Sequence, residues 1–250
     1  MDWKHKCSLD WLRERQRYLT ATDVKSLIPV TKTGRPRKIT DMERLKVRAS
    51  KMVTLTEEDC WSYGAAARGH LLEPYAIDAL NDYLVDCGAT RQMFFHWDDE
   101  LIHVPGSVLA FSPDAMDIPQ HVSNGATPHA IAEVKCYSTE RHLMTGFTPK
   151  SQIEERWQIA TAMATLDSID YAYLVLFDPR LDDDYRLFVI MYERHDLRDE
   201  IDTIYNVAMD WDSFYTLGMP LSPDTSHSLD GLDEAEIVDE LEHAQRLNPV

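Results

Sequence analysis

The sequence predicts a mixed α/β domain in which helices flank one central sheet. Apolar residues recur at helical spacing across residues 64–84 and 151–166. Short segments rich in aromatic and branched apolar residues lie between these helices and after the second one, as is typical of strands. At 250 residues, the chain is long enough to bury a core without disulfides. The order of helices, strands, helix and strands therefore favours a mixed sheet covered by helices.

The first half of this core is expected to contain one helix and three strands. A single apolar stripe predicts the helix over 64–84, and its members are Leu72, Tyr75, Ala76, Ala79, Leu80 and Tyr83. Aromatic and apolar residues then predict strands over 92–97 and 107–112. Residues 129–137 alternate with a period of two, which predicts a third strand.

The second half is expected to contain a helix followed by a hairpin. The helix is predicted over 151–166, where one stripe holds Ile153, Trp157, Ala160 and Ala164. Two apolar segments, 171–177 and 186–192, predict strands. The polar link between these strands, residues 178–185, indicates that they form a hairpin.

The cysteines and the hydropathy exclude several classes of protein. The four cysteines form no C-x-x-C pair, which excludes a disulfide framework and a thiolate zinc module: Cys7, Cys60, Cys87 and Cys136. No apolar run approaches the ~20 residues that span a bilayer, and the first residues lack the apolar core of a signal peptide. We therefore expect a protein of a reducing cytoplasm, without membrane contact.

The charge is unevenly distributed along the chain. The formal net charge of −18, taken alone, argues against a nucleic-acid binder, because the phosphate backbone repels negative charge. Residues 1–51 nevertheless hold 14 Lys and Arg against 6 Asp and Glu, a net charge of +8, whereas the rest of the chain carries −26. We expect this basic segment to be either an arm that follows phosphates or a solvated surface.

The same patterns predict the domain organisation. We expect one domain over residues 1–216, with the basic segment 1–51 at its start and a core over 64–196. Residues 217–250 form an acidic tail, in which three apolar residues have helical spacing: Ile237, Val238 and Leu241. A linker that leads into a short amphipathic helix and a frayed solubilising tail both agree with this composition.

Ionisable residues lie on one predicted strand and just after another. Glu133 and Lys135 lie on the same face of the strand 129–137, whose other face is apolar. Two such groups on a buried strand cost free energy unless they are paired or functional. Upstream, Asp114 follows Ser112-Pro113 at the end of another predicted strand. The pattern is therefore Pro-Asp, eighteen residues, then Glu-x-Lys.

These residue types agree with metal-assisted hydrolysis of a phosphodiester, in which a hard cation polarises the phosphate and binds the attacking water. Mg²⁺ prefers oxygen ligands and keeps several waters. Asp114, Glu133 and the main-chain carbonyl of Val134 can supply such a set, and Mn²⁺ can substitute. We expect the ammonium of Lys135 to orient the water. A surface ion pair beside a turn is the alternative interpretation of these residues.

Two helical residues extend the expected site. Glu73 lies beside the apolar stripe of the first helix, where it is expected to reach the metal or its water. Gln158 lies on the second helix, and its amide is expected to bind the water or a phosphate oxygen. The metal site itself is expected at the edge of the sheet.

The sequence resembles the lambda-exonuclease (YqaJ-type) branch of the PD-(D/E)xK nucleases over residues 11–196. Six ordered motifs carry this resemblance: Trp11 with Arg15 and Leu19-Thr20-Ala21-Thr22, Gly69-x-x-x-Glu73, Ser112-Pro113-Asp114, Glu133-Val134-Lys135, Gln158, and Phe177-Asp178-Pro179-Arg180. Three positions depart from the family pattern, namely Thr22 in place of Ser, Ala115 in place of Gly, and Arg156 in place of Gln. None of them changes the Asp, Glu and Lys core.

The resemblance implies a restriction-endonuclease-like core and a role for each motif residue. Asp114 and Glu133 would bind Mg²⁺, Glu73 would assist the metal or its water, Lys135 would be the catalytic lysine, and Gln158 would contact the water or the scissile phosphate. A pocket for a 5′-phosphate would be formed by Arg15, Thr22 and Ser112. The basic segment would then face the DNA.

The resemblance also implies an activity and partners. Members of the family degrade one strand of linear duplex DNA from 5′ to 3′ in viral or phage recombination. They act as a ring-shaped homotrimer around the DNA, often with a single-strand annealing protein, in the cytoplasm of the host cell. Two alternatives remain, namely an endonuclease with the same core and an acidic DNA mimic or interaction protein built on a decayed nuclease fold. The intact Asp114, Glu133 and Lys135 set argues against decay.

Overall fold

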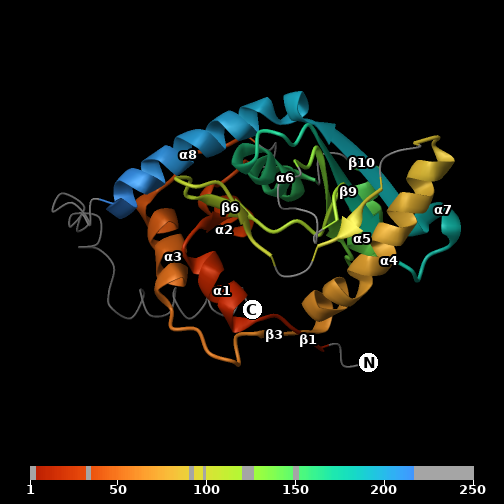
Figure 1. Cartoon of the computed structure of the whole chain (residues 1–250), viewed down its shortest axis with the longest axis horizontal. Helices are drawn as coiled ribbons and strands as arrows, with labels where there is room; N and C mark the ends of the chain where they lie inside the picture. Colours follow the sequence, from red (N-terminus) through yellow and green to blue (C-terminus); the bar gives the residue numbers. More distant parts are fainter. Residues whose placement is uncertain are drawn as a thin grey trace. The chain divides into compact units, whose positions relative to one another are not determined.

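The computed structural model describes residues 4–31, 35–89, 93–97, 100–119, 127–148 and 152–216 (Figure 1). The predicted acidic tail and its short helix lie outside these residues. By contacts, the chain divides into two compact units, Met1–Ala208 and Met209–Val250, and the fold described below is that of the first. The last helix, α8 (Arg198–Thr216), crosses this boundary, and it follows a short 3-10 helix, η3 (Arg194–Leu197).

The first unit is built on a five-stranded mixed sheet. Its strand order is β10 (Leu187–Glu193), β9 (Tyr171–Phe177), β8 (Ala130–Lys135), β7 (Ala115–Met116) and β4 (Phe95–His96). β8 and β9 are parallel, and the other neighbours are antiparallel. Parallel neighbours need a crossover connection, which here consists of α5 (Thr139–Phe147) and α6 (Ile153–Thr165). The predicted mixed sheet flanked by helices is confirmed.

Two helices pack on opposite faces of the central strands (Figure 1). α4 (Gly64–Asp86) buries one apolar stripe, which includes Ala76, Leu80 and Leu84, against Ala132 and Val134 of β8. The alternate residues of β8 face α6, where Gln158 reaches Glu133. Because the side chains of a strand alternate between faces, the period of two seen in the sequence separates an apolar face from a polar one.

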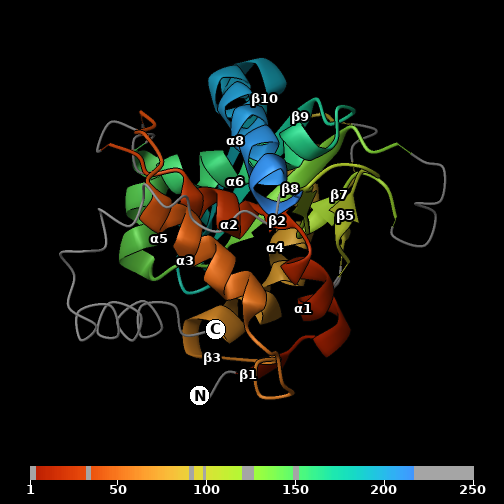
Figure 2. The same ribbon diagram turned by 90° about the vertical axis from the view of Figure 1, so that its left-hand side faces the viewer.

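Smaller elements complete the first unit. A three-stranded sheet has the order β2 (Leu19–Thr20), β6 (Leu109–Phe111) and β5 (Ile102–His103), and a two-stranded ladder joins β1 (Lys4–Lys6) to β3 (Trp61–Tyr63). The remaining helices are α1 (Leu9–Gln16), α2 (Ala21–Leu27), α3 (Asp41–Met52) and α7 (Asp183–Arg186). Figure 2 views the unit from the side of α1 and α3.

Most predicted elements agree with the structure, and one is assigned to a different sheet. The helices predicted over 64–84 and 151–166 are α4 and α6, and the predicted hairpin is the antiparallel pair of β9 and β10. The segment 107–112 contains β6, which pairs with β2 and β5 and is not part of the central sheet. Its placement in one central sheet was wrong, because the break at Pro113 and Asp114 separates β6 from β7.

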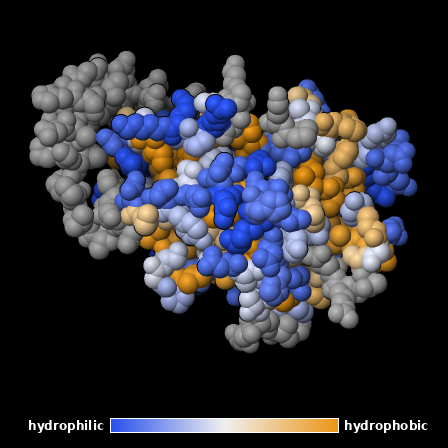
Figure 3. Space-filling view, turned by 90° about the horizontal axis from the view of Figure 1, so that it is seen from above, coloured by the Kyte–Doolittle hydropathy of each residue, from blue (hydrophilic) through white to orange (hydrophobic). Residues whose placement is uncertain are grey.

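The described surface combines charged and apolar areas. Seen from above, hydrophilic residues occupy the middle of the face, and hydrophobic ones gather toward its right-hand side (Figure 3). Large apolar side chains that are exposed include Met144 and Phe147 on α5 and Tyr185 on α7. None of the described helices combines the length and hydropathy required of a membrane span.

The contact of α5 with β10 gives a stability prediction. Gly146 lies in α5, and a Cβ placed there would meet the Phe188 ring at 2.5–2.7 Å. The ring is itself held between His142 and Phe147, with centroids 5.1 Å from each. Gly146→Ala is therefore expected to lower the free energy of unfolding by about 1–3 kcal/mol, measured by urea denaturation.

Gly69 provides the matched control for this prediction. It lies in α4, where an added Cβ meets nothing within 4 Å. Because glycine in a helix is less favourable than alanine, Gly69→Ala is expected to raise the free energy of unfolding by up to about 1 kcal/mol. Equal effects of the two substitutions would contradict the close packing at Phe188.

Candidate active site

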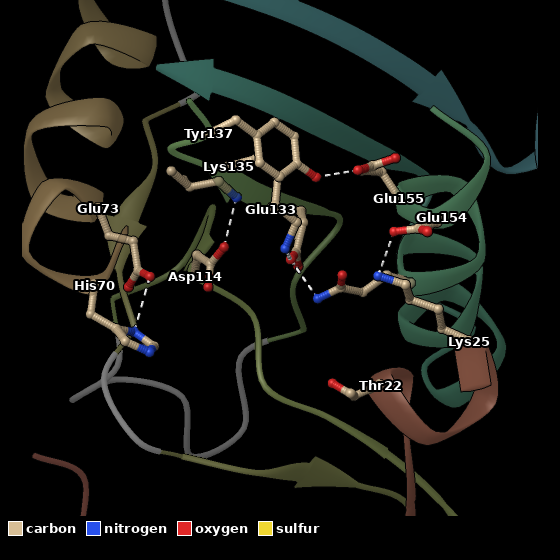
Figure 4. Close-up of polar contacts among 12 residues, drawn as sticks. Thr22, Lys25, His70, Glu73, Asp114, Glu133, Lys135, Tyr137, Glu154 and Glu155 are labelled. Atoms are coloured by element: carbon tan, nitrogen blue, oxygen red, sulfur yellow. Dashed lines mark hydrogen bonds and ion pairs between the residues drawn. The ribbon is translucent and has the colours of Figure 1, made fainter. Parts of the chain in front are cut away.

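Four of the predicted catalytic residues come together near the end of β8 in Figure 4, namely Glu73, Asp114, Glu133 and Lys135, and Gln158 bonds to Glu133. Glu133 and Lys135 project from β8 toward α6, which carries Gln158. Asp114 lies in the turn that leads into β7, and Glu73 lies on α4. Residues that are up to 85 positions apart in the sequence thus form one cluster.

Strand register explains the position of Asp114. β7 pairs with β8 so that Ala115 lies opposite Ala132, and one further step of the antiparallel register places Asp114 opposite Glu133. Asp114 Oδ2 accepts a hydrogen bond from the Val134 N–H at 2.6 Å, which holds its carboxylate beside β8. Burial, and then the charges of Glu133 and Glu73, raise the pKa of Asp114 well above its usual range.

Glu133 is held by two donors. Its side chain is 8% exposed, and its Oε1 lies 2.5 Å from both Lys135 Nζ and Gln158 Nε2. Burial lowers the pKa of Lys135, but the nearby carboxylates of Glu133 and Asp114 outweigh this effect and raise it. Lys135 therefore stays protonated and compensates the buried negative charge of its neighbours.

Glu73 is held by two histidines. His70 Nδ1 lies 3.1 Å from Glu73 Oε1, one helical turn away, and His96 Nε2 of β4 lies 3.7 Å from Oε2. Burial raises the pKa of Glu73, but the hydrogen bond from His70 and the charges of His70 and His96 lower it to about 2. Nothing in the sequence pattern singles out His96, whereas the spacing of three residues between His70 and Glu73 was a usable signal.

The donor chemistry of this cluster suits a hard divalent cation. Three carboxylates converge with a single lysine, and their mutual repulsion, seen in the raised pKa of Asp114, is relieved by a cation. Within the described part of the chain, no group of three His, Cys, Asp or Glu side chains is already arranged as a metal ligand set. To bind a metal ion, the Glu133 carboxylate would have to give up its hydrogen bond from Lys135 or from Gln158.

The three residues predicted to bind a 5′-phosphate lie near the paired strands β2 and β6. These strands are parallel, with Thr20 opposite Ala110, so Thr22 and Ser112 both follow the same end of the pair. Arg15 Nη2 donates to Thr22 Oγ1 at 3.5 Å. Ser112 Oγ donates to the carbonyl of Glu100 at 2.8 Å. Figure 4 shows Thr22 on α2, with no bond drawn from it to the catalytic residues.

Two lysines of the basic segment form ion pairs. Lys51 Nζ lies 2.5 Å from Asp23 Oδ2, and its side chain is 7% exposed. It also donates to the carbonyl of Arg15 at 3.1 Å, which joins α3 to α1 and α2. Lys25 Nζ lies 2.7 Å from Glu154 of α6. Lys51 is therefore a structural residue that ties α3 to α1 and α2.

The motif around Asp178 has a structural role that its sequence did not reveal. Asp178 is fully buried at the end of β9, where it accepts two hydrogen bonds from Arg180 at 2.7 Å and one from Thr139 at 2.8 Å. Arg68 of α4 donates to Asp178 at 3.2 Å and to the carbonyl of Tyr137 at 3.2 Å. This cluster connects the chain just after Lys135 to the start of α4.

A second cluster of polar residues, which sequence reasoning missed, lies just beyond the end of β8. The Tyr137 hydroxyl donates to Glu155 of α6, which is 1% exposed (Figure 4). The guanidinium of Arg141 lies 4.1 Å from the centre of the Tyr137 ring and 3.4 Å from Glu154 Oε2 and Glu155 Oε1. A half-exposed cation thus stacks on Tyr137, which lies two residues beyond Lys135, on the side of the sheet that carries Glu155.

Comparisons with known proteins identify the fold. No protein family model matches the sequence, and no curated protein matches it. The structure is similar to an alkaline exonuclease (LHK-Exo) from Laribacter hongkongensis, with a TM-score of 0.54 and 20% identity over 84% of this chain and 96% of that one. The same exonuclease in complex with dAMP has a TM-score of 0.53 and 20% identity, over 83% and 96% of the two chains.

A third solved structure is a phage related exonuclease from Haemophilus somnus 129PT. Its TM-score is 0.50 at 16% identity, over 81% of this chain and 96% of that one. The chain therefore has the fold of these exonucleases. The resemblance indicated by the six motifs is confirmed for the fold.

The Asp178 cluster predicts a large, pH-dependent effect on stability. Burial raises the pKa of Asp178, but the bonds from Arg180 and Thr139 outweigh this and lower it. A carboxylate with a lowered pKa in the folded state stabilises the protein above its unfolded pKa, and that contribution is lost as the pH falls through the folded value. Asp178→Asn is expected to lower the free energy of unfolding by about 3 kcal/mol at pH 7.

Urea denaturation between pH 7 and pH 3 tests this expectation, and the difference between wild type and Asp178→Asn is expected to shrink toward pH 3. Asp184→Asn is the matched control, because Asp184 is exposed on α7. Its effect is expected to stay within about 0.5 kcal/mol. A difference for Asp178→Asn that is small at pH 7, or constant with pH, would argue against the buried ion pair.

Proposed function

We propose that this protein is a metal-dependent deoxyribonuclease that removes nucleotides from the 5′ ends of linear duplex DNA. One observation carries the proposal, namely the convergence of Asp114, Glu133 and Lys135 at the end of one strand, within the fold of the alkaline exonucleases. The 5′ polarity is supported by the contact of Arg15 with Thr22 and by the position of Ser112 at the same strand end.

The residues of this chain have distinct roles in the proposed reaction. Asp114, Glu133 and the carbonyl of Val134 would hold Mg²⁺, which polarises the phosphate and lowers the pKa of bound water. Lys135, protonated between Glu133 and the solvent, offers an ammonium to the phosphate oxygens as negative charge develops on them. Gln158 exchanges its bond to Glu133 for one to the water or the phosphate. Glu73, kept ionised by His70 and His96, accepts a hydrogen bond from the water.

The proposal includes the partners implied by the family resemblance. The protein would act as a ring-shaped homotrimer around duplex DNA, in the cytoplasm of a host cell, beside a single-strand annealing protein. Mass photometry of the full chain with and without duplex DNA measures the number of subunits directly.

Removal of either buried charge is expected to abolish hydrolysis. Glu133→Gln and Lys135→Ala should lower the rate of nucleotide release from linear duplex DNA in Mg²⁺ on the order of 10²–10³-fold or more, because the first removes a proposed metal ligand and the second removes the cation that faces the reacting phosphate. Circular dichroism verifies that the variants fold. Glu140→Gln, at an exposed position of α5, is the control that retains activity.

The choice of substrate separates the proposal from its alternatives. Release from linear DNA should require Mg²⁺ or Mn²⁺ and stop with a chelator, and closed circular DNA should resist. Cleavage of circles as fast as linear DNA would indicate an endonuclease. Calorimetry that detects neither Mg²⁺ nor Mn²⁺ binding, with inactivity on every DNA, would favour an acidic mimic.

Arg15 is expected to determine the preference for phosphorylated ends. Its guanidinium lies over the Trp11 ring, 4.4 Å from the centroid, and contacts Thr22. Arg15→Ala should bring the ratio of rates on 5′-phosphate and 5′-hydroxyl duplexes close to one, since a charged contact to the phosphate is lost. Arg13→Ala, on an exposed position of the same helix, should leave the ratio unchanged. Release of the 3′-labelled nucleotide first would overturn the assigned polarity.

A further inference from the structure

The short ladder at the start of the chain brings two cysteines together. β1 and β3 are antiparallel, and their register pairs Lys4 with Tyr63, His5 with Ser62 and Lys6 with Trp61. One further step of this register places Cys7 opposite Cys60. The two residues are 53 positions apart in the sequence, so their spacing there contains no sign of this proximity.

The backbone geometry at this pair is suited to a disulfide. The Cys7 N–H donates to the Cys60 carbonyl at 3.0 Å, so Cys7 and Cys60 occupy a hydrogen-bonded position of the ladder. Such pairs have Cα atoms ~5.5 Å apart and side chains on the same face. Disulfides join residues whose Cα atoms are about 4.4–6.8 Å apart. The bond can therefore form without movement of the strands.

The thiols themselves lie close to this geometry. Cys7 Sγ lies 3.4 Å from the Cys60 carbonyl oxygen, which places it over the Cys60 peptide. Cys60 Sγ lies 3.8 Å from the carbonyl of Thr56 and needs only a rotation about its χ1 bond to face Cys7. Cys7 is half-buried, whereas Cys60 is 2% exposed, so a small oxidant reaches Cys7 first.

We propose that Cys7 and Cys60 are a redox modification site that forms a reversible disulfide on exposure to a peroxide. The Cys7 thiolate attacks one oxygen of hydrogen peroxide, which gives a sulfenic acid and hydroxide. The Cys60 thiolate then attacks the Cys7 sulfur, and the oxygen of the sulfenic acid leaves as hydroxide. With the two thiol protons, the products are one disulfide and two waters. Dithiols such as dithiothreitol reverse the bond.

The other two cysteines lack this arrangement. Cys87 is exposed at the end of α4, and Cys136 is half-buried just after β8. Burial, and then the charge of Glu73, raise the pKa of Cys136 to about 12, which keeps it from forming a thiolate. Neither residue lies opposite a cysteine in any strand pair of the described chain.

The disulfide would act on the segment that supports Glu73. The ring of His5 stacks on that of His70 at 4.4 Å between centroids, and His70 in turn contacts Glu73. β3 leads directly into α4, which carries both His70 and Glu73. Oxidation therefore joins β1 to β3 covalently and closes a 53-residue loop. The loop lowers the conformational entropy of the unfolded chain, which raises the free energy of unfolding.

Peptide mapping of the full-length protein tests the proposal. The reduced protein is treated with hydrogen peroxide, its remaining thiols are blocked with N-ethylmaleimide, and it is digested with trypsin without reductant. The expected product is a disulfide-linked pair of peptides, residues 7–13 and 52–68, each of which holds a single cysteine. The melting temperature is expected to rise by about 5 °C or more, and both signals should disappear after dithiothreitol.

Three variants make the result decisive. Cys7→Ser and Cys60→Ser should each lose the linked peptide and the rise in melting temperature, and Cys7→Ser, at the less buried position, keeps the test valid where Cys60→Ser fails to fold. Cys87→Ser is the control, and both signals should persist in it. Recovery of Cys7 and Cys60 as separate maleimide adducts or sulfinic acids, or linkage of either one to Cys87 between molecules, would overturn the proposal.

Discussion

The buried negative charge at the end of β8 is the constraint on which the rest of the structure depends. Glu73, Asp114 and Glu133 repel one another, and a single lysine lies among them. Such groups stay together only where the backbone and directed hydrogen bonds hold them. The Val134 N–H holds Asp114, Lys135 and Gln158 hold Glu133, and two histidines hold Glu73. β7 is very short, and its pairing with β8 is what positions Asp114.

This cluster is supported from one face of the sheet and from the ends of its strands. On one face, the apolar stripe of α4 packs on Ala132 and Val134, which fixes the helix that carries Glu73. At the strand ends, Arg68 and Arg180 close around Asp178, so α4, β8 and β9 share one buried ionic contact. A charged cluster that cannot relax is preorganised, which is the property that electrostatic catalysis requires.

The sequence was most informative where one periodicity dominates. α4, α6, β9 and β10 follow uninterrupted apolar patterns, and their ends were predicted within about two residues. The sheet of β2, β6 and β5 escaped prediction because its strands hold two or three residues and because β2 pairs with β6 across 90 positions. In the same way, Glu133 and Lys135 could be predicted to share a face, whereas His96, the bonds of Asp178 and the pair of Cys7 with Cys60 depend on tertiary contacts alone.

The net charge of the chain is a poor guide to how it would hold DNA, because local pairing decides which charges act on a ligand. Lys51 is buried against Asp23, and Lys135 lies against Glu133, so neither cation acts at long range. Three carboxylates beside one lysine repel a phosphate. In the proposed enzyme, a divalent cation reverses this local charge, so that the metal and the scissile phosphate each strengthen the binding of the other. An acidic protein can thus hold a polyanion at one point while its remaining surface rejects it.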